Sequence, residues 1–200
     1  RAVQIAETAA LEDWIARETK LGNATLTAEV KSGNEKLAHV KRWSDAVNHA
    51  IEDIVKGVPP FPLFTESLEQ MALRADTMVI SQTPTDALER EWLEHDIRKG
   101  VRIIAGQELG TKTEHLKLAA QDKYAPEKIL MIGDAPGDYK AAKANGALFY
   151  PIVPGNEENS WKQFHDEALN RFFSGAFAGE YETQLLKCFE ASLPENPPWC

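Results

Sequence analysis

The fold is decided by residues 128–146, which read KILMIGDAPGDYKAAKANG. Residues 129–132 are apolar without a polar interruption, which is typical of a strand buried on both faces. Gly133 permits a tight exit from that strand, and Pro136 suits the first turn of a helix. Gly146, directly after an asparagine, is a common helix stop. The stretch therefore predicts a buried strand followed at once by a helix.

Two carboxylates, Asp134 and Asp138, lie where this strand ends and the helix begins. Ligands of open α/β sheets bind at such junctions. Either residue alone could cap the helix. Two ionised carboxylates about one turn apart, however, repel each other unless a cation lies beside them. Because Mg²⁺ prefers oxygen ligands of this kind, we predict that both residues hold Mg²⁺, with helix capping as the alternative.

Composition restricts the class of protein. Two hundred residues suit one medium domain, or one domain with a small insert. The net charge of −9 argues against nucleic acid as the main partner. The two cysteines, Cys188 and Cys200, have neither metal-ligand nor redox-motif spacing, which favours a reducing compartment. With no signal-peptide pattern and no long apolar run, we expect a cytoplasmic protein without a membrane partner.

The first 57 residues carry helical patterns and no strand pattern. Apolar residues recur at helical spacing over residues 1–20 and again over residues 37–55. Gly57 closes the second pattern, and Pro59-Pro60 prevents its continuation. We therefore predict a separate helical unit over residues 1–57.

Strand and helix patterns then alternate. Strands are predicted at residues 77–80, 101–105, 129–132 and 147–153, and helices at residues 65–74, 84–100, 112–124 and 136–144. Thr83 is expected to cap one helix with Pro84 in its first turn, and Thr111 and Glu114 form the pattern of a capping box. Crossovers of this length produce a parallel sheet with helices on its faces. We predict a three-layer α/β core over residues 58–155 and a helical extension over residues 156–200.

Polar groups follow three successive strands of the predicted sheet. Ser81 ends the first strand, Lys112 opens the helix after the second, and the two aspartates follow the third. Ser81 alone could be an ordinary strand-end serine, and Lys112 alone a solvated lysine. Together they suit a phosphoryl group, because the hydroxyl and nearby backbone N–H groups bind its oxygens while Lys112 and Mg²⁺ neutralise its charge. The five histidines show no paired metal spacing.

These residues resemble a known superfamily. The segment MVIS ending in Ser81, Lys112 before a helix, and ILMIGDAPGDYKAAKANGA are similar, in order and spacing, to the second, third and fourth motifs of the haloacid dehalogenase-like hydrolases. The resemblance covers about residues 59–153. Residues 1–57 are similar in position and helical character to that superfamily's helical cap.

The resemblance implies a Rossmann-like core that hydrolyses small phosphorylated metabolites with Mg²⁺ as cofactor. Ser81, Gln82 and Lys112 would bind phosphate, Ser81 and Lys112 would act in catalysis, and Asp134 and Asp138 would serve the Mg²⁺ site. The superfamily's first motif, an Asp-x-Asp that supplies the nucleophile, does not occur in this sequence. We expect it upstream of residue 1, on a strand between those at residues 77–80 and 129–132. The 200 residues alone are therefore predicted to be inactive.

Two alternatives remain open at this point. The chain could be a non-catalytic scaffold that kept a phosphate and metal pocket without the nucleophile. It could also be a phosphomutase or phosphonatase of the same superfamily. Carbon–halogen hydrolysis is less expected, because that branch does not need Mg²⁺ whereas both site carboxylates are present here.

Overall fold

The computed structural model describes residues 8–18, 21–120 and 122–194. The chain divides after Val58 into two units, whereas the sequence places the boundary after residue 57. Each unit has its own hydrophobic core and is described by itself. No helix in the three described ranges is long and apolar enough to cross a membrane.

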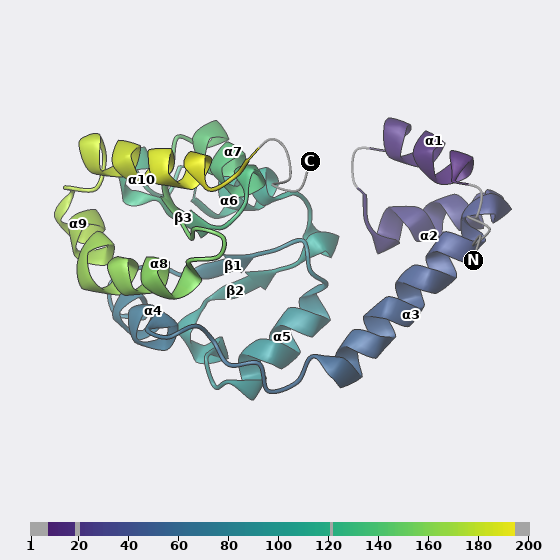
Figure 1. Ribbon diagram of the computed structural model, residues 1–200, viewed down its shortest axis with the longest axis horizontal. Helices are drawn as coiled ribbons and strands as arrows, with labels where there is room; N and C mark the ends of the chain where they lie inside the picture. The colour runs from purple at the N-terminus through teal and green to yellow at the C-terminus, as the bar shows by residue number, and fades with distance from the viewer. Residues whose placement is uncertain (1–7, 19–20, 121, 195–200) are drawn as a thin grey trace. The chain divides into compact units, whose positions relative to one another are not determined.

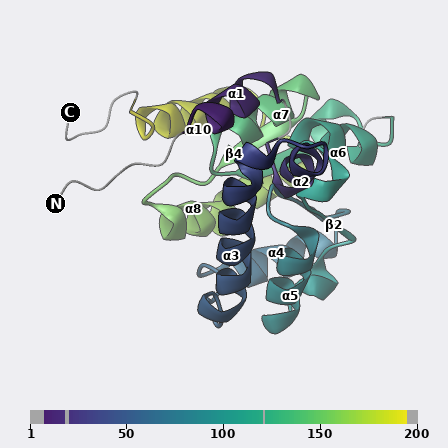
Figure 2. The ribbon, with the colours of Figure 1, turned by 90° about the vertical axis from the view of Figure 1, so that its right-hand side faces the viewer.

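The described residues of the first unit form helices joined by short turns and contain no strand. Its elements are α1 (Ala9–Arg17), α2 (Asn23–Lys31), a short 3₁₀ turn and α3 (Ala38–Ile54), which Figure 2 shows as one long helix. Trp14, Leu26 and Leu37 form the buried core of this unit. Residues 1–7 and 19–20 of the predicted first helix lie outside the described part. The sequence pattern missed α2, whose run NATLTAEVK has little apolar periodicity.

The second unit begins with two strands and two helices near their predicted positions. They are α4 (Phe64–Ala72), β1 (Met78–Ile80), α5 (Thr85–Glu94) and β2 (Ile103–Ala105) (Figure 1). β1 and β2 are parallel, with Val79 opposite Ile104. Leu68 of α4 and Leu88 of α5 bury against Ile104, so both helices are held to this strand pair.

A second parallel pair follows. Its elements are α6 (Lys112–Ala120), β3 (Leu130–Gly133), α7 (Pro136–Ala144) and β4 (Leu148–Pro151). The register places Met131 opposite Phe149 and Gly133 opposite Pro151. Met131 and Phe149 pack against α6 and α7, while Tyr150, one residue further along, packs in a different cluster. The period of two along the strands thus gives this sheet a helical layer on each face.

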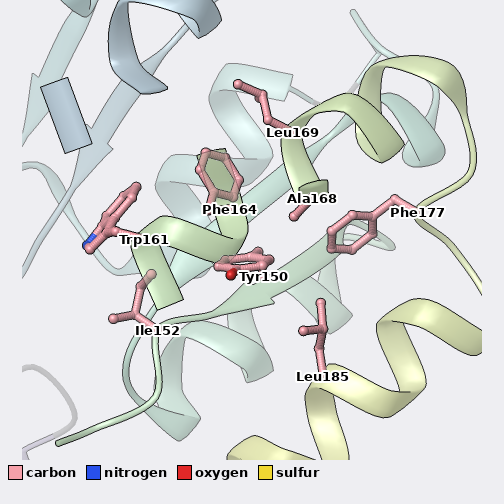
Figure 3. Close-up of a cluster of buried hydrophobic side chains, with 8 residues drawn as sticks. All are labelled: Tyr150, Ile152, Trp161, Phe164, Ala168, Leu169, Phe177 and Leu185. Carbon is pink, nitrogen blue, oxygen red and sulfur yellow. The ribbon is translucent and has the colours of Figure 1, made fainter. Parts of the chain in front are cut away.

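The last helices supply most of the second layer. They are α8 (Glu157–Gln163), a π-helical turn (Phe164–Ala168), α9 (Leu169–Ser174) and α10 (Glu180–Ala191). α10 lies along the outer edge of β4, where Leu185 and Phe189 contribute to the two clusters. Figure 3 shows their apolar side chains gathered around Tyr150 of β4. The Tyr150 hydroxyl donates a 2.6 Å hydrogen bond to the carbonyl of Ser160. Burial raises the pKa of Tyr150 well above its usual range, so the hydroxyl keeps this proton. The segment that the sequence described as an extension therefore supplies much of the larger core.

The outer edge of β4 is closed to further pairing. The N–H of Phe149 donates to the Glu182 carboxylate at 2.9 Å, and the N–H of Val153 donates to the Ser160 hydroxyl at 3.0 Å. Between them, Pro151 has no N–H to offer. Burial raises the pKa of Glu182, and the hydrogen bond from Phe149 partly offsets that effect. No backbone donor on this edge is left for another strand.

Unlike the outer edge of β4, the edges of β1 and β3 that face away from their partner strands carry backbone groups that are unpaired among the described residues. In a parallel ladder alternate residues bond to one neighbour, so the N–H and C=O groups of Ile80, Leu130 and Ile132 point away from β2 and β4. Among the described residues each sheet has only two strands, and β1 and β3 are not paired with each other. Ile80 nevertheless packs against the cluster that contains Met131. Two parallel strand pairs thus share one core without a hydrogen-bonded connection, in a mixed α/β fold.

Candidate functional site

An ion pair between the half-buried Lys112 and the buried Asp138 lies at the junction after β3. The Asp138 side chain is only 4% exposed, and the Lys112 ammonium donates a hydrogen bond to its Oδ1. The backbone N–H of Ala135 donates to its Oδ2 at 3.1 Å. Asp138 therefore caps α7, and the cation beside it is the ammonium of Lys112. Both oxygens of this predicted metal ligand are engaged by protein groups.

The start of α6 fixes the position of Lys112. The Glu114 N–H donates to the Thr111 hydroxyl at 3.2 Å, and the Thr111 N–H donates to the Glu114 carboxylate at 2.8 Å. These reciprocal bonds confirm the predicted capping box. Lys112 is thus the first residue of α6, where the positive end of the helix disfavours a cation. Asp138 offsets that unfavourable placement.

Gly133 allows Asp138 to approach the end of β3. A Cβ atom at this position would lie 2.5 Å from the Cβ, Cγ and Oδ2 atoms of Asp138. A side chain there would therefore displace the carboxylate from both Lys112 and Ala135.

Replacing Gly133 with alanine should destabilise the second unit by roughly 1–3 kcal/mol, because the added methyl overlaps Asp138. Gly137→Ala is the matched control, since a Cβ there meets nothing within 4 Å and the residue lies inside α7. Alanine at that helical position should be neutral or stabilise by about 0.5–1 kcal/mol. Urea unfolding of both variants compares the two effects. Equal stability of the two variants would contradict the close approach.

Asp134 is exposed directly after β3, and no described residue forms a hydrogen bond or ion pair with its side chain. Its carboxylate is free for a cation. Mg²⁺ is commonly held by one or two carboxylates plus water and substrate phosphate, so Asp134 fits such a role as a lone protein ligand. Within the described residues, no cluster of three or more His, Cys, Asp or Glu side chains could hold a metal by itself.

Ser81 and Gln82 form the turn after β1. The Ser81 N–H donates to the Ala105 carbonyl at 3.0 Å, and the Ser81 hydroxyl accepts the N–H of Thr83 at 3.1 Å. Gln82 is exposed. In the described part of the chain, neither residue contacts Lys112, Asp134 or Asp138 through a hydrogen bond. The structure thus joins Lys112 to Asp138 and leaves the other predicted site residues on separate turns.

The predicted start of α5 is wrong by one residue. The helix begins at Thr85, and Pro84 occupies the capping position with no side-chain hydrogen bond. The carboxylate of Glu108, on the loop after β2, accepts the Thr85 N–H at 3.1 Å and the Thr85 hydroxyl at 2.9 Å. The Glu108 cap replaces the predicted Thr83 cap. No local pattern signals this contact, because 23 residues separate the two partners.

His115 has no metal-ligand spacing in the sequence, but its environment in the structure is unusual. It lies one turn after Lys112, and its side chain is buried. Neither ring nitrogen has a hydrogen-bond partner among the described residues. A buried polar group of this kind destabilises the fold by roughly 1–3 kcal/mol unless it is satisfied.

A groove of about 300 Å³ lies elsewhere, between α8 and α10. Its polar lining consists mainly of uncharged side chains, including Asn156, Asn159, Gln163, Gln184 and Tyr181. Burial raises the pKa of Tyr181 to about 12, so this hydroxyl is neutral at physiological pH. Without a cationic side chain the groove is poorly suited to phosphate.

Comparisons with protein-family models, curated proteins and solved structures find no match for this chain. The interpretation of the site therefore depends on the chemistry of its own residues. Those residues provide the ammonium of Lys112, which an ion pair holds in place, and the exposed carboxylate of Asp134, which is unpaired among the described residues. They also provide the hydroxyl of Ser81 in the turn after β1.

Proposed function

We propose that this chain forms most of a Mg²⁺-dependent phosphatase that acts on small phosphate monoesters, with a Rossmann-like core of the haloacid dehalogenase-like type. The observation that supports it most is the Lys112–Asp138 ion pair, together with the exposed carboxylate of Asp134, which precedes Asp138 by four residues on the same junction and is unpaired within the described ranges. The Lys112 ammonium can bind phosphate oxygens, and the exposed carboxylate of Asp134 can bind a metal ion. Both groups lie at the end of one parallel strand, which suits a phosphoryl group. A helix cap alone would need neither the lysine nor the second aspartate.

Each residue of the proposed site has a distinct role. Asp138 accepts one hydrogen bond from the Lys112 ammonium, which has two further N–H donors available for phosphate oxygens. Asp134 would hold Mg²⁺, which supplies charge neutralisation at the transferring phosphoryl group when bound. The Ser81 hydroxyl and the backbone N–H of Gln82 would bind the remaining phosphate oxygens. Substrate phosphate is thereby held and polarised but not attacked.

The nucleophile is proposed to lie on a further strand between β1 and β3. The unpaired groups of Ile80, Leu130 and Ile132 on these edges support such a strand, since an unpaired row of N–H and C=O groups at a sheet edge is a template for pairing with another strand. An aspartate oxygen at the end of that strand would attack phosphorus while the P–O ester bond breaks. The leaving oxygen would take a proton from a general acid, for which the second aspartate of the Asp-x-Asp is the candidate, and depart as the alcohol. Water would then hydrolyse the aspartyl-phosphate and release inorganic phosphate.

The test of this function is hydrolysis of p-nitrophenyl phosphate. We expect no turnover above background by the 200-residue chain, because no carboxylate in it is placed to attack phosphorus. A longer chain with an upstream Asp-x-Asp segment should turn over this ester only when Mg²⁺ is present. Asn-x-Asp in that segment is the control and should be inactive. Substantial hydrolysis by the purified 200-residue chain would overturn the proposal.

A non-catalytic phosphate-binding scaffold is the second candidate. The absence of Asp-x-Asp from the sequence favours it. The two candidates differ in one result. A scaffold would bind inorganic phosphate with Mg²⁺ and stay inactive in the longer chain, whereas the phosphatase would gain activity.

A further inference from the structure

The turn after β1 is tied to the loop after β2 by a compact set of hydrogen bonds. The Gln107 N–H donates to the Thr83 carbonyl at 3.1 Å. The Gly106 N–H donates to the Thr85 hydroxyl at 3.2 Å. Glu108 then accepts both the N–H and the hydroxyl of Thr85. Three consecutive residues of one loop thus hold the other.

This contact requires close approach of the two backbones. A Cβ atom on Gly106 would lie 2.4 Å from the Thr85 hydroxyl oxygen and 2.5 Å from the Thr85 nitrogen. Partial burial raises the pKa of Glu108, but hydrogen bonds from its own backbone N–H, from Thr85 and from Gln107 outweigh that effect and hold the pKa below its usual range. Glu108 is therefore ionised at physiological pH, and the hydrogen bonds that it accepts are charge-assisted.

The turn held in this way contains Ser81 and Gln82. Ser81 is anchored to β2 through the carbonyl of Ala105, and its hydroxyl accepts the N–H of Thr83. No described residue accepts the backbone N–H of Gln82. The turn therefore combines a fixed hydroxyl with one open backbone donor.

We infer that Glu108 is a positioning residue for the proposed phosphate site, because it fixes the turn that presents the Ser81 hydroxyl and the Gln82 N–H. The inference rests on the proposed function. Glu108 acts through Thr85 and not by contact with phosphate. Its own negative charge opposes an anion nearby, so its contribution must come from the hydrogen bonds that it accepts.

Three variants separate the effect of the Glu108 hydrogen bonds from the effect of its negative charge. Glu108→Ala removes the hydrogen bonds and the charge, while Glu108→Gln removes the charge and keeps an amide oxygen that accepts from Thr85. Glu157→Ala is the matched control, because Glu157 accepts a 2.9 Å bond from the N–H of Gly155 on a different loop. The affinity of the 200-residue chain for inorganic phosphate with Mg²⁺ is measured by calorimetry. Amide exchange at Thr85 and Gly106 reports loosening of the turn.

We expect Glu108→Ala to weaken phosphate binding about tenfold and to accelerate exchange at both amides. Glu108→Gln should stay within about threefold of wild type, and Glu157→Ala should not change affinity. Wild-type affinity in Glu108→Ala overturns the inference and leaves the proposed function intact. Tighter binding by both Glu108 variants also overturns it, because charge repulsion then dominates. Failure of the wild type to bind phosphate overturns the proposed function, and this inference with it.

Discussion

Replacing Lys112 with methionine is expected to destabilise the second unit by roughly 3–5 kcal/mol. The Asp138 carboxylate is only 4% exposed, so the substitution leaves a buried charge without its counterion. Methionine has a similar length and helix propensity, which keeps packing and helix formation nearly constant. Urea unfolding followed by circular dichroism measures the loss.

The control for this experiment is Lys117→Met on the same helix. Lys117 is exposed and one turn further from the site, so its replacement should change the unfolding free energy by no more than about 0.5 kcal/mol. Adding Asp138→Asn to Lys112→Met should restore part of the stability, because the unpaired charge is removed. Wild-type stability of Lys112→Met would show that the ion pair does not fix this junction.

The second large effect is expected for Asp134→Asn. This variant should lose most of the Mg²⁺-induced stabilisation and, in the longer chain, most of the phosphatase activity. Ligand binding to the folded state stabilises by RT ln(1 + [L]/Kd), which is about 2.7 kcal/mol at one hundred times Kd. Without Mg²⁺, stability should be unchanged or slightly improved, because removing one of two neighbouring negative charges relieves repulsion. Melting curves with and without Mg²⁺ measure both effects.

Asp86→Asn is a suitable control, because Asp86 is exposed in the first turn of α5. Its thermal shift with Mg²⁺ should equal that of the wild type. If Asp134→Asn gains the same shift and the longer chain stays active, Asp134 is not a metal ligand. An exposed aspartate that binds no cation predicts that result.

Local patterns predicted much of the fold. The apolar run before Gly133 is β3, and the Thr111–Glu114 capping box forms as expected. These features depend on residues within one turn of each other. The start of α5 could not be predicted in the same way, because its cap comes from Glu108 on another loop. The π-helical turn after α8 likewise has no local signal that we recognise.

For the candidate site, the sequence identified the polar residues but not the contacts between them. The sequence identified Lys112 and Asp138 as polar groups at strand ends, but it assigned Asp138 to Mg²⁺ and not to the lysine. The two residues are 26 positions apart, so their contact depends on how α6 and α7 pack. The Mg²⁺ assignments of Asp134 and Asp138 both stay predictions. Glu108 and His115 were missed because burial and long-range partners single them out, not spacing.

In the proposed enzyme, a further strand that carries the nucleophile lies between β1 and β3. Residue-resolved amide exchange tests this arrangement most directly. In the 200-residue chain, the N–H groups of Ile80, Leu130 and Ile132 should exchange rapidly, while those of Met131 and Gly133, which bond to β4, should be protected. In the longer chain all five should be protected. Protection of Ile80, Leu130 and Ile132 already in the 200-residue chain would contradict the account, because β1 and β3 would then be paired without an intervening strand.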